Sequence, residues 1–177
     1  NLCVTPLSSS DPPKELREIV KNIEFELESR LDTLALPENL LEAAKYAVMN
    51  GGKRVRPALS ILCCEAVGGT IEQAMPAAIA VEFIHCFSLV HDDLPAIDND
   101  DLRRGQPTLH IKSGEAMAVL AGDLLLPVAF SQLISETFTI KQQATLTKLL
   151  ASATSDMVIG QVYDTLGGLP KHLNAQE

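Results

Sequence analysis

The sequence predicts an all-α fold. Apolar residues recur at helical spacing in several long stretches, pairs of glycines separate these stretches, and no stretch alternates apolar and polar residues as a half-exposed strand would. The composition agrees with a soluble helical protein, because 46% of the residues are hydrophobic and only 4% are aromatic. We therefore expect a single helical domain over residues 1–177, with residues 1–12 as a loose N-terminal tail.

Local signals place six helices along the chain. The first begins after Ser10-Asp11-Pro12-Pro13, since proline suits the first turn of a helix. Pro95 ends the fourth helix near Asp93. Glycine pairs end the second, third and last helices, at Gly51-Gly52, Gly68-Gly69 and Gly167-Gly168. The expected helices span residues 13–34, 38–50, 55–67, 71–94, 114–137 and 140–166.

Charge and hydropathy exclude two classes of partner. The formal net charge is -9 and no broad basic face stands out, so nucleic acid is not an expected partner. The apolar run Leu124–Phe130 is too short to span a bilayer and is interrupted by Pro127. We expect no membrane span.

The cysteines indicate a reducing compartment. Cys3, Cys63, Cys64 and Cys86 show no metal-ligand spacing, and no secretory signal precedes them. The expected location is cytoplasmic, and the plastid stroma stays open as the alternative.

An acidic cluster follows the fourth helix. Five aspartates fall within ten positions, between an apolar helical run and the pair Arg103-Arg104. They are Asp92, Asp93, Asp98, Asp100 and Asp101. Acids at a helix C-terminus oppose the helix dipole and repel one another, so a bound cation would stabilise them. A solvated acidic loop is the alternative, and the flanking apolar helix and arginines favour the cation site.

The spacing of the acids favours magnesium over calcium. A calcium-binding EF-hand needs an acid at loop position five and glycine at position six, whereas counting from Asp98 places Leu102 and Arg103 there. Magnesium usually binds through a few carboxylates and keeps substrate phosphates among its other ligands. The adjoining arginines would bind such phosphates, so we expect Mg2+ as the cofactor.

The break in the helix at Pro95 determines whether these acids can lie close to one another. Asp92 and Asp98 are six residues apart and would differ by about 120° around an ideal helix. A straight helix could not aim both at one ion. We expect the chain to bulge at Pro95 so that Asp98 returns toward Asp92.

A cationic segment, Gly51-Gly52-Lys53-Arg54-Val55-Arg56-Pro57, precedes the third helix. Gly51 and Gly52 suit a helix C-cap and a close backbone approach. Lys53 and Arg56 are three residues apart and would aim two cations at one anion if a helix starts here. The segment is not a P-loop, because the GxxxxGKS or GxxxxGKT order is absent. A plain charged surface is the other interpretation.

Together, GGKRVRP and HDDLPAIDNDDLRRGQPTLH closely resemble motifs of the trans-type prenyl diphosphate synthases, the farnesyl and geranylgeranyl diphosphate synthase family. The similarity extends over most of the chain from about Leu40 onward, including residues 82–90, 114–123 and 160–164. It implies an isoprenoid-synthase-type helical bundle and a magnesium-dependent prenyltransferase. The implied substrates are isopentenyl diphosphate and an allylic diphosphate (dimethylallyl, geranyl or farnesyl), and the implied assembly is a homodimer.

The resemblance also implies roles for individual residues. Asp92, Asp93 and Asp98 match the first acidic motif of the family, which holds Mg2+ on the allylic diphosphate. Arg103 is expected to bind that diphosphate, and it completes the expected catalytic set with the three aspartates. The residues expected to bind the diphosphate of isopentenyl diphosphate are Gly52, Lys53, Arg56, His85 and Arg104. His85 lies seven residues before Asp92 and therefore on nearly the same helix face.

Product length in this family depends on bulk one turn before the first acidic residue, which here means Phe87 and Ser88. A large ring at Phe87 would stand under the growing chain, so we expect a fifteen-carbon product. The nearby stretch of residues 63–69 looks more like that of geranylgeranyl synthases, and a twenty-carbon product stays open.

Residues 169–177 resemble the family's loop before its next helix. The sequence therefore predicts a fold truncated before the second Asp-rich helix, without the family's Lys-Thr pair. Two interpretations stay open. The residues belong to an active synthase whose remainder is not in the sequence, or they form a short noncatalytic subunit or fragment that binds diphosphate and Mg2+ or a full-length synthase. The intact first acidic motif favours the synthase.

Overall fold

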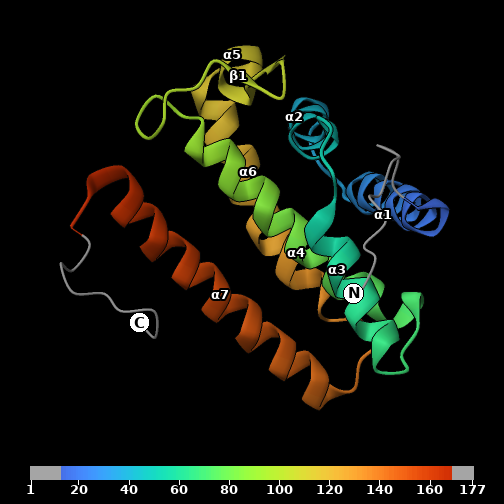
Figure 1. The fold of residues 1–177 in the computed structure, drawn as a ribbon. Coiled ribbons are helices and arrows are strands. Elements are labelled where there is room, and N and C mark those ends of the chain that lie inside the picture. The colour runs from blue at the N-terminus through green and yellow to red at the C-terminus, as the bar shows by residue number, and fades with distance from the viewer. Residues whose placement is uncertain (1–12, 169–177) are drawn as a thin grey trace, which may run out of the picture.

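A computed structural model of the chain describes residues 13–168, which form seven helices and one two-stranded hairpin (Figure 1). The helices are α1 (Lys14–Asp32), α2 (Glu38–Met49), α3 (Val55–Ala66), α4 (Ile71–Asp92), α5 (Leu109–Ser113), α6 (Glu115–Gln132) and α7 (Ile140–Leu166). The strands of the hairpin are β1 (Leu102–Arg103) and β2 (Gln106–Pro107). The expected tail, residues 1–12, lies outside the described residues.

The all-α prediction is confirmed, and the six expected helices are present with ends within five residues of those expected. The largest difference is at the end of α6. There Leu133 and Ile134 donate to carbonyls three residues back instead of four, which tightens the last turn and ends the helix.

Two elements were not predicted from the sequence, the five-residue α5 and the hairpin. Strands of two residues are too short to show an alternating pattern. The strands pair antiparallel, with Leu102 opposite Pro107 and Arg103 opposite Gln106. Arg104 and Gly105 form the turn with φ of 55° and 77°, and two positive φ angles suit the right-handed twist of a tight hairpin.

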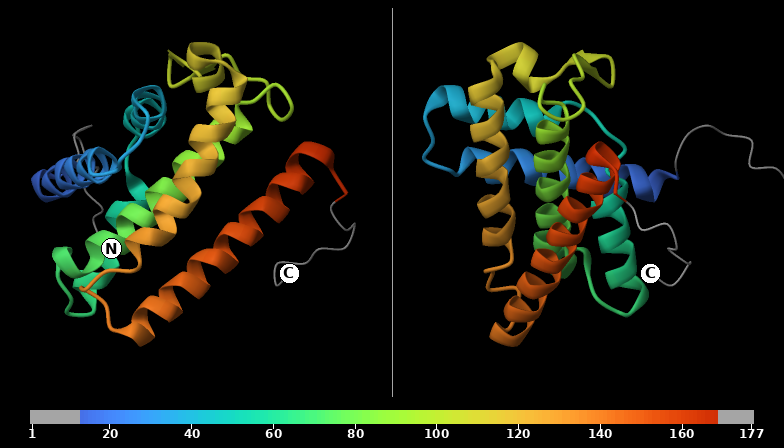
Figure 2. Two further views of the ribbon diagram at one scale, coloured as in Figure 1. Left: turned by 180° about the vertical axis from the view of Figure 1, so that it is seen from behind. Right: turned by 90° about the vertical axis from the view of Figure 1, so that its left-hand side faces the viewer.

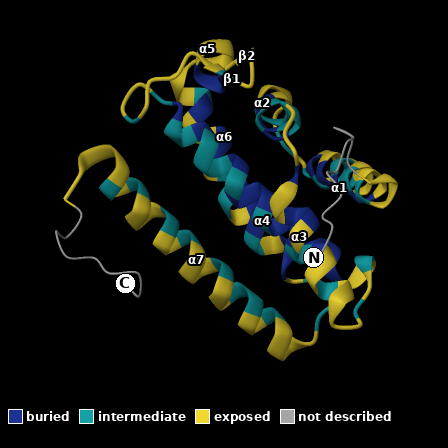
Figure 3. Ribbon diagram, viewed as in Figure 1, coloured by how far each residue is buried: buried dark blue, intermediate teal, exposed yellow. Residues whose placement is uncertain are grey.

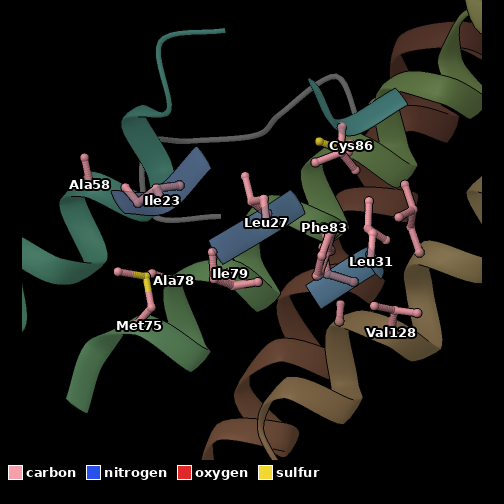
Figure 4. Packing of buried hydrophobic residues seen from close by; sticks show 14 of the residues in the cluster. Ile23, Leu27, Leu31, Ala58, Met75, Ala78, Ile79, Phe83, Cys86 and Val128 are labelled. Atoms are coloured by element: carbon pink, nitrogen blue, oxygen red, sulfur yellow. The ribbon is translucent and has the colours of Figure 1, made fainter. Parts of the chain in front are cut away.

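The core forms around α4, which packs against α6, α3 and α1. Helix α1 contributes a stripe of buried residues four apart, among them Ile23 and Leu27. Figure 4 shows these residues in one cluster with Ile79 and Phe83 of α4. Helices α1 and α2 lie on one side of the α4–α6 pair, and α5 with the hairpin lies beyond the end of α4 (Figures 1 and 2). Core packing therefore fixes α4 in place, including the end that carries the acidic cluster.

Helices α4 and α6 are long and apolar enough, by length and composition alone, to cross a membrane. Of the apolar window of each helix, 61% is buried inside the fold in α4 and 39% in α6. Helix α4 also carries the buried, ion-paired Glu82. Burial in the domain accounts for the apolar character of α4. The absence of a membrane span stays a prediction.

Helix α7 lies along the α4–α6 pair on the side away from α1 and α2 (Figures 1 and 2). Within the described part of the chain it has no buried residue, in contrast to α4 (Figure 3). It begins with a capping box in which Thr139 and Gln142 bond to each other's backbone N–H groups. Local capping thus defines the start of α7 more than packing does.

Helices α4 and α6 come close together at Gly122 of α6, where the His91 ring lies in the space that a side chain would fill. The ring meets Phe87 edge-on at 4.9 Å between centroids, and its Nε2 atom lies 3.2 Å from the carbonyl oxygen of Val119. His91 directly precedes Asp92, so this contact fixes the last turn of α4.

We expect Gly122→Ala to destabilise the domain by about 1–3 kcal/mol, because the new methyl group must displace a ring that is held on two sides. Gly160→Ala is the matched control. Gly160 also lies in a helix, but a Cβ there meets nothing within 4 Å, so alanine should stabilise the helix by about 0.5–1 kcal/mol. The free energy of unfolding in urea measures both. A Gly122→Ala variant as stable as the unaltered chain would contradict the close approach.

Candidate functional site

The acidic loop folds back onto the end of α4. The backbone N–H of Asp98 donates to the carbonyl of Asp92 at 2.9 Å, and that of Asp100 donates to Asp93 at 3.3 Å. Asn99 makes the reversal with a φ of 55°, which asparagine tolerates better than most residues. Asp98 therefore returns to Asp92, as the break at Pro95 predicts.

Asp92 lies in an environment with excess negative charge. Its side chain is partly buried, and burial, followed by the nearby charge of Asp98, raises the pKa of Asp92 above its usual value. Asp98 is exposed. Two carboxylates that repel each other at an accessible position fit a divalent cation, with water or phosphate oxygens as the remaining ligands.

Asp93 and Arg103, expected to hold the metal and a diphosphate respectively, bind each other. Asp93 is 4% exposed, and the Nε atom of Arg103 donates to its Oδ1 at 2.7 Å. The hydrogen bond to Asp93 is also the main cause of a raised pKa at Arg103. Within residues 13–168, no three His, Cys, Asp or Glu side chains converge as a ready metal site. The three expected metal ligands are therefore not gathered at one point. Asp93 is held by Arg103, whereas Asp92 and Asp98 stay accessible to a metal ion.

The expected anion-binding residues come together in one pocket. It is open to solvent, has a volume of about 500 Å³, and draws its lining from the cationic segment, from α4 and from the hairpin turn. The lining residues are Gly52, Lys53, Arg54, Val55, Arg56, Glu82, His85 and Arg104. All five residues expected to bind isopentenyl diphosphate are among them, and we call this space the anion pocket.

Arg103 and Arg104 are adjacent but reach different segments. Arg103 contacts the acidic loop, whereas Nη1 of Arg104 donates to the carbonyl oxygen of Gly51. The guanidinium of Arg104 lies against Gly52, where an added Cβ would fall 2.5 Å from Nη1. Gly52 also has a φ of +131°, which side chains disfavour. The bare backbone at Gly52 is therefore what admits Arg104 to the pocket.

The hairpin that carries these arginines is itself anchored. The hydroxyl of Thr108 donates to the carbonyl of Asp100 at 2.8 Å, and the hydroxyl of Tyr46 donates to that of Pro107 at 2.7 Å. One bond ties the hairpin to the acidic loop and the other ties it to α2. The two arginines are thus positioned from both sides.

His85 contributes a neutral ring to the anion pocket. Burial, followed by the charge of Arg56, lowers the pKa of His85 below the ordinary 6.5. Its Nε2 atom lies 3.5 Å from Nη1 of Arg56. A neutral imidazole carries one N–H, so His85 can donate one hydrogen bond to an anion without adding charge.

Phe87 and Ser88 lie on α4 between His85 and the acids. Phe87 is partly buried and packs against the core cluster. The hydroxyl of Ser88 donates to the carbonyl of His85 at 2.9 Å, inside the helix. The structure thus places a large ring one turn before the acidic end of α4, and Ser88 has its polar group satisfied.

Sequence reasoning missed a buried ion pair behind the pocket. Arg54 is 3% exposed, and its Nη1 atom donates to Oε1 of Glu82 at 2.8 Å. A signal was available, because Glu82 is the only acid in the long apolar stretch between Gln73 and His91. A carboxylate in such a helix needs a cationic partner.

A second open pocket, of about 480 Å³, lies between α3, the start of α4 and the start of α7. Lys141 is the one charged residue in its lining, and none of the expected site residues is part of it. The chemistry suggested by the sequence therefore lies in the anion pocket and at the end of α4.

Three comparisons show what the chain is similar to. A family model described as Polyprenyl synthetase matches residues 37–176. A relative described as heterodimeric geranylgeranyl pyrophosphate synthase large subunit 1, chloroplastic, from Arabidopsis thaliana is 52% identical over 136 residues, and one described as dimethylallyltranstransferase from Fischerella ambigua is 49% identical over 125. A solved geranyltransferase structure from Legionella pneumophila superposes with a TM-score of 0.86 at 34% identity.

These matches cover most of the chain and a smaller part of each relative. The alignments with the two curated relatives cover 72% and 71% of the chain, and the chain spans 36% of the length of each relative. The Legionella structure covers 92% of the chain, which spans 59% of that structure. The residues that line the anion pocket and those of the acidic loop fall within residues 37–176, the part that the family model matches.

We expect His85→Gln to make stability less dependent on pH. The pKa of His85 is lowered in the folded chain, so the unfolded chain takes up a proton first as the pH falls below about 6.5, and the native state loses stability there. Glutamine takes up no proton. The fall in unfolding free energy from about pH 7 to about pH 5 should be smaller in the variant, as urea titrations at the two pH values would show. An equal fall would contradict the buried, neutral ring.

Proposed function

The chain belongs to the polyprenyl synthetase family, and on that premise we propose that its protein is a short-chain trans-prenyl diphosphate synthase. The reaction would join an allylic diphosphate to isopentenyl diphosphate and give farnesyl or geranylgeranyl diphosphate. The observation that carries the proposal is the arrangement along α4. On one face of α4, His85 in the anion pocket is followed about two turns later by Asp92. Asp98 of the acidic loop folds back to Asp92 there.

The anion pocket would hold the diphosphate of isopentenyl diphosphate. Lys53, Arg56 and Arg104 bring three cations from two segments of the chain to one space. Fixed cations bind phosphate oxygens without reorganising, and His85 can add a neutral donor. The buried Glu82 also lines the pocket, but its charge is paired with Arg54.

The end of α4 would hold Mg2+ and the allylic diphosphate. Asp92 and Asp98 fit the ion because burial and the charge of Asp98 raise the pKa of Asp92, and the nearby charge of Arg103 offsets this only in part. When bound, Mg2+ would neutralise charge on the leaving diphosphate. Arg103 contacts Asp93 through Nε and Nη2, and we assign its Nη1 to the diphosphate. Asp93 would mainly orient Arg103, and direct metal binding by Asp93 would require this pair to open.

The chemistry needs no nucleophilic side chain. The bond from the allylic carbon to the diphosphate oxygen breaks, and the electron pair leaves with the diphosphate. The double bond of isopentenyl diphosphate then attacks the allylic cation and a carbon–carbon bond forms. The new cation loses a proton to the released diphosphate, and a new double bond forms. The protein's part is to hold two diphosphates in fixed relative positions, stabilise the charge on the leaving group and exclude water.

Two observations bear on product length. Phe87 places a large ring one turn before the acids, which favours the fifteen-carbon product. The Arabidopsis relative is described as a geranylgeranyl synthase, which favours the twenty-carbon product. We therefore propose farnesyl or geranylgeranyl diphosphate and assign the limit on chain growth to Phe87.

Assembly and location are part of the proposal. We propose a homodimer, and the description of the Arabidopsis relative as heterodimeric gives a mixed dimer as the alternative. Light scattering of the purified protein, alone and mixed with a synthase partner, separates the two. A cytoplasmic location stays a prediction, with the plastid stroma as its alternative because that relative is described as chloroplastic.

We expect Asp92→Asn combined with Asp98→Asn to abolish magnesium-dependent prenyl transfer and allylic diphosphate binding in the complete natural protein, because the variant keeps the shape of the site but loses its charge. Asp101→Asn is the matched control. Asp101 is exposed in the same loop and is not an expected ligand, so its variant should stay active. Product formation from labelled isopentenyl diphosphate and calorimetric titration give the readout. Undiminished binding in the double variant would refute the metal assignment.

We expect Phe87→Ala to lengthen the product by at least one five-carbon unit, since the ring that would stop the growing chain is removed. Phe130→Ala is the control, because Phe130 is also partly buried against the core cluster but lies on α6. Chromatography of the dephosphorylated products compares the two variants. An unchanged product profile in Phe87→Ala would remove this residue as the limit on chain length.

A further inference from the structure

Arg54 is the buried member of the cationic segment, and its guanidinium links three helices to the start of a fourth. Nη1 donates to Glu82 of α4 at 2.8 Å, and Nη2 donates to the carbonyl of Val48 of α2 at 2.8 Å. Nε lies 3.6 Å from Oε1 of Glu24 of α1. Arg54 itself occupies the N-cap position of α3, without a side-chain capping hydrogen bond. The orientation of its side chain is therefore fixed from three directions.

The backbone of Arg54 is in a conformation that side chains disfavour. Its φ of 49° and ψ of 37° are left-handed, which costs about 1–2 kcal/mol for a residue with a Cβ. Such a conformation persists only where surrounding contacts impose it. The contacts of the guanidinium supply that constraint. The same backbone turn separates Lys53 from Arg56, so it sets where both side chains leave the chain.

Glu82 connects this anchor to the pocket. It is 2% exposed and lies on α4 one turn before His85, and both residues line the anion pocket. The ion pair thus joins the loop that carries Lys53 to the helix that carries His85. A change in the pair would shift one side of the pocket relative to the other.

We propose that Arg54 and Glu82 are positioning residues for the anion pocket: they hold the loop of Lys53 and Arg56 in register with His85 on α4. The proposal rests on the proposed function, in which this pocket binds the diphosphate of isopentenyl diphosphate. Neither residue needs to touch the substrate. Their effect is confined to one of the two diphosphates, because Asp92 and Asp98 lie outside the pocket lining.

Charge-conserving substitutions distinguish an effect of side-chain geometry on the pocket from an effect of net charge. Arg54→Lys keeps the positive charge, but an ammonium group lacks the planar fork that reaches Glu82 and Val48 together. Glu82→Asp keeps the negative charge and withdraws the carboxylate by one methylene. Neither change alters the net charge around the pocket, so a weaker diphosphate interaction in these variants reports on geometry.

The chain offers matched controls in a second arginine–glutamate pair. Arg30 binds Glu26 through Nε and Nη2, and its Nη1 donates to Gln132 of α6 at 2.9 Å. This pair lies within α1 and is partly buried, and Arg30 links α1 to α6 through Gln132, but neither member of the pair lines the anion pocket. Arg30→Lys and Glu26→Asp therefore make the same chemical changes at a contact of similar kind.

Steady-state kinetics of the complete natural protein tests the proposal. Arg54→Lys and Glu82→Asp should raise the KM for isopentenyl diphosphate about tenfold, as loss of a supporting contact does in other sites. The KM for the allylic diphosphate and kcat should stay within about twofold. Arg30→Lys and Glu26→Asp should lower the melting temperature without changing either KM. Assays run well below the lowest melting temperature keep all variants folded.

An unchanged KM for isopentenyl diphosphate in both pocket variants would overturn the proposal. A lower kcat together with a rise in both KM values, in pocket and control variants alike, would also overturn it, because that pattern reports general loosening. If the unaltered protein transfers no prenyl group, the proposed function fails. Calorimetric titration with inorganic diphosphate then decides the inference alone: weaker binding by the pocket variants supports it, and equal binding, or no binding by the unaltered protein, refutes it.

Discussion

The packing of α4 against α3 and α6 is the constraint on which the rest of the structure depends. One side of α4 carries Ile79 and Phe83 into the core, and the same helix carries His85 and Asp92 toward the two charged regions. Because the core fixes the position and rotation of α4, the distance between these regions is set by helix geometry and not by flexible loops. The contact of His91 with Gly122 extends this control to the last turn.

In both charged regions, internal ion pairs hold some of the charged side chains and leave the others accessible to solvent and ligands. Asp93 is bound by Arg103, and Glu82 is bound by Arg54. Both paired carboxylates are buried, and a buried charge without a partner would be strongly destabilising. The charge of Asp92, by contrast, is offset only in part by Arg103, and Asp98 is exposed. The stability of the domain and the ion binding that we propose thus depend on different members of the same clusters.

The sequence was sufficient to predict the six longer helices of the described residues, because long periodic stretches and glycine pairs are local signals. It also predicted the return of Asp98, since a proline break has a direct geometric consequence. It could not show that Arg54 is buried while Lys53 and Arg56 stay exposed. That difference depends on a left-handed backbone and on contacts with three distant segments, none of which leaves a periodic pattern. The Asp93–Arg103 pair is not evident from the sequence either. An aspartate suits a metal ion and an arginine suits a diphosphate as well as each suits the other.

The most direct test of the account is a crystal structure of the complete natural protein with Mg2+, isopentenyl diphosphate and an unreactive allylic diphosphate analogue. We expect the diphosphate of isopentenyl diphosphate to lie within hydrogen-bonding distance of Lys53, Arg56 and Arg104, and Mg2+ to be bound by Asp92 and Asp98. A diphosphate bound away from this pocket, or a metal that contacts neither aspartate, would contradict it.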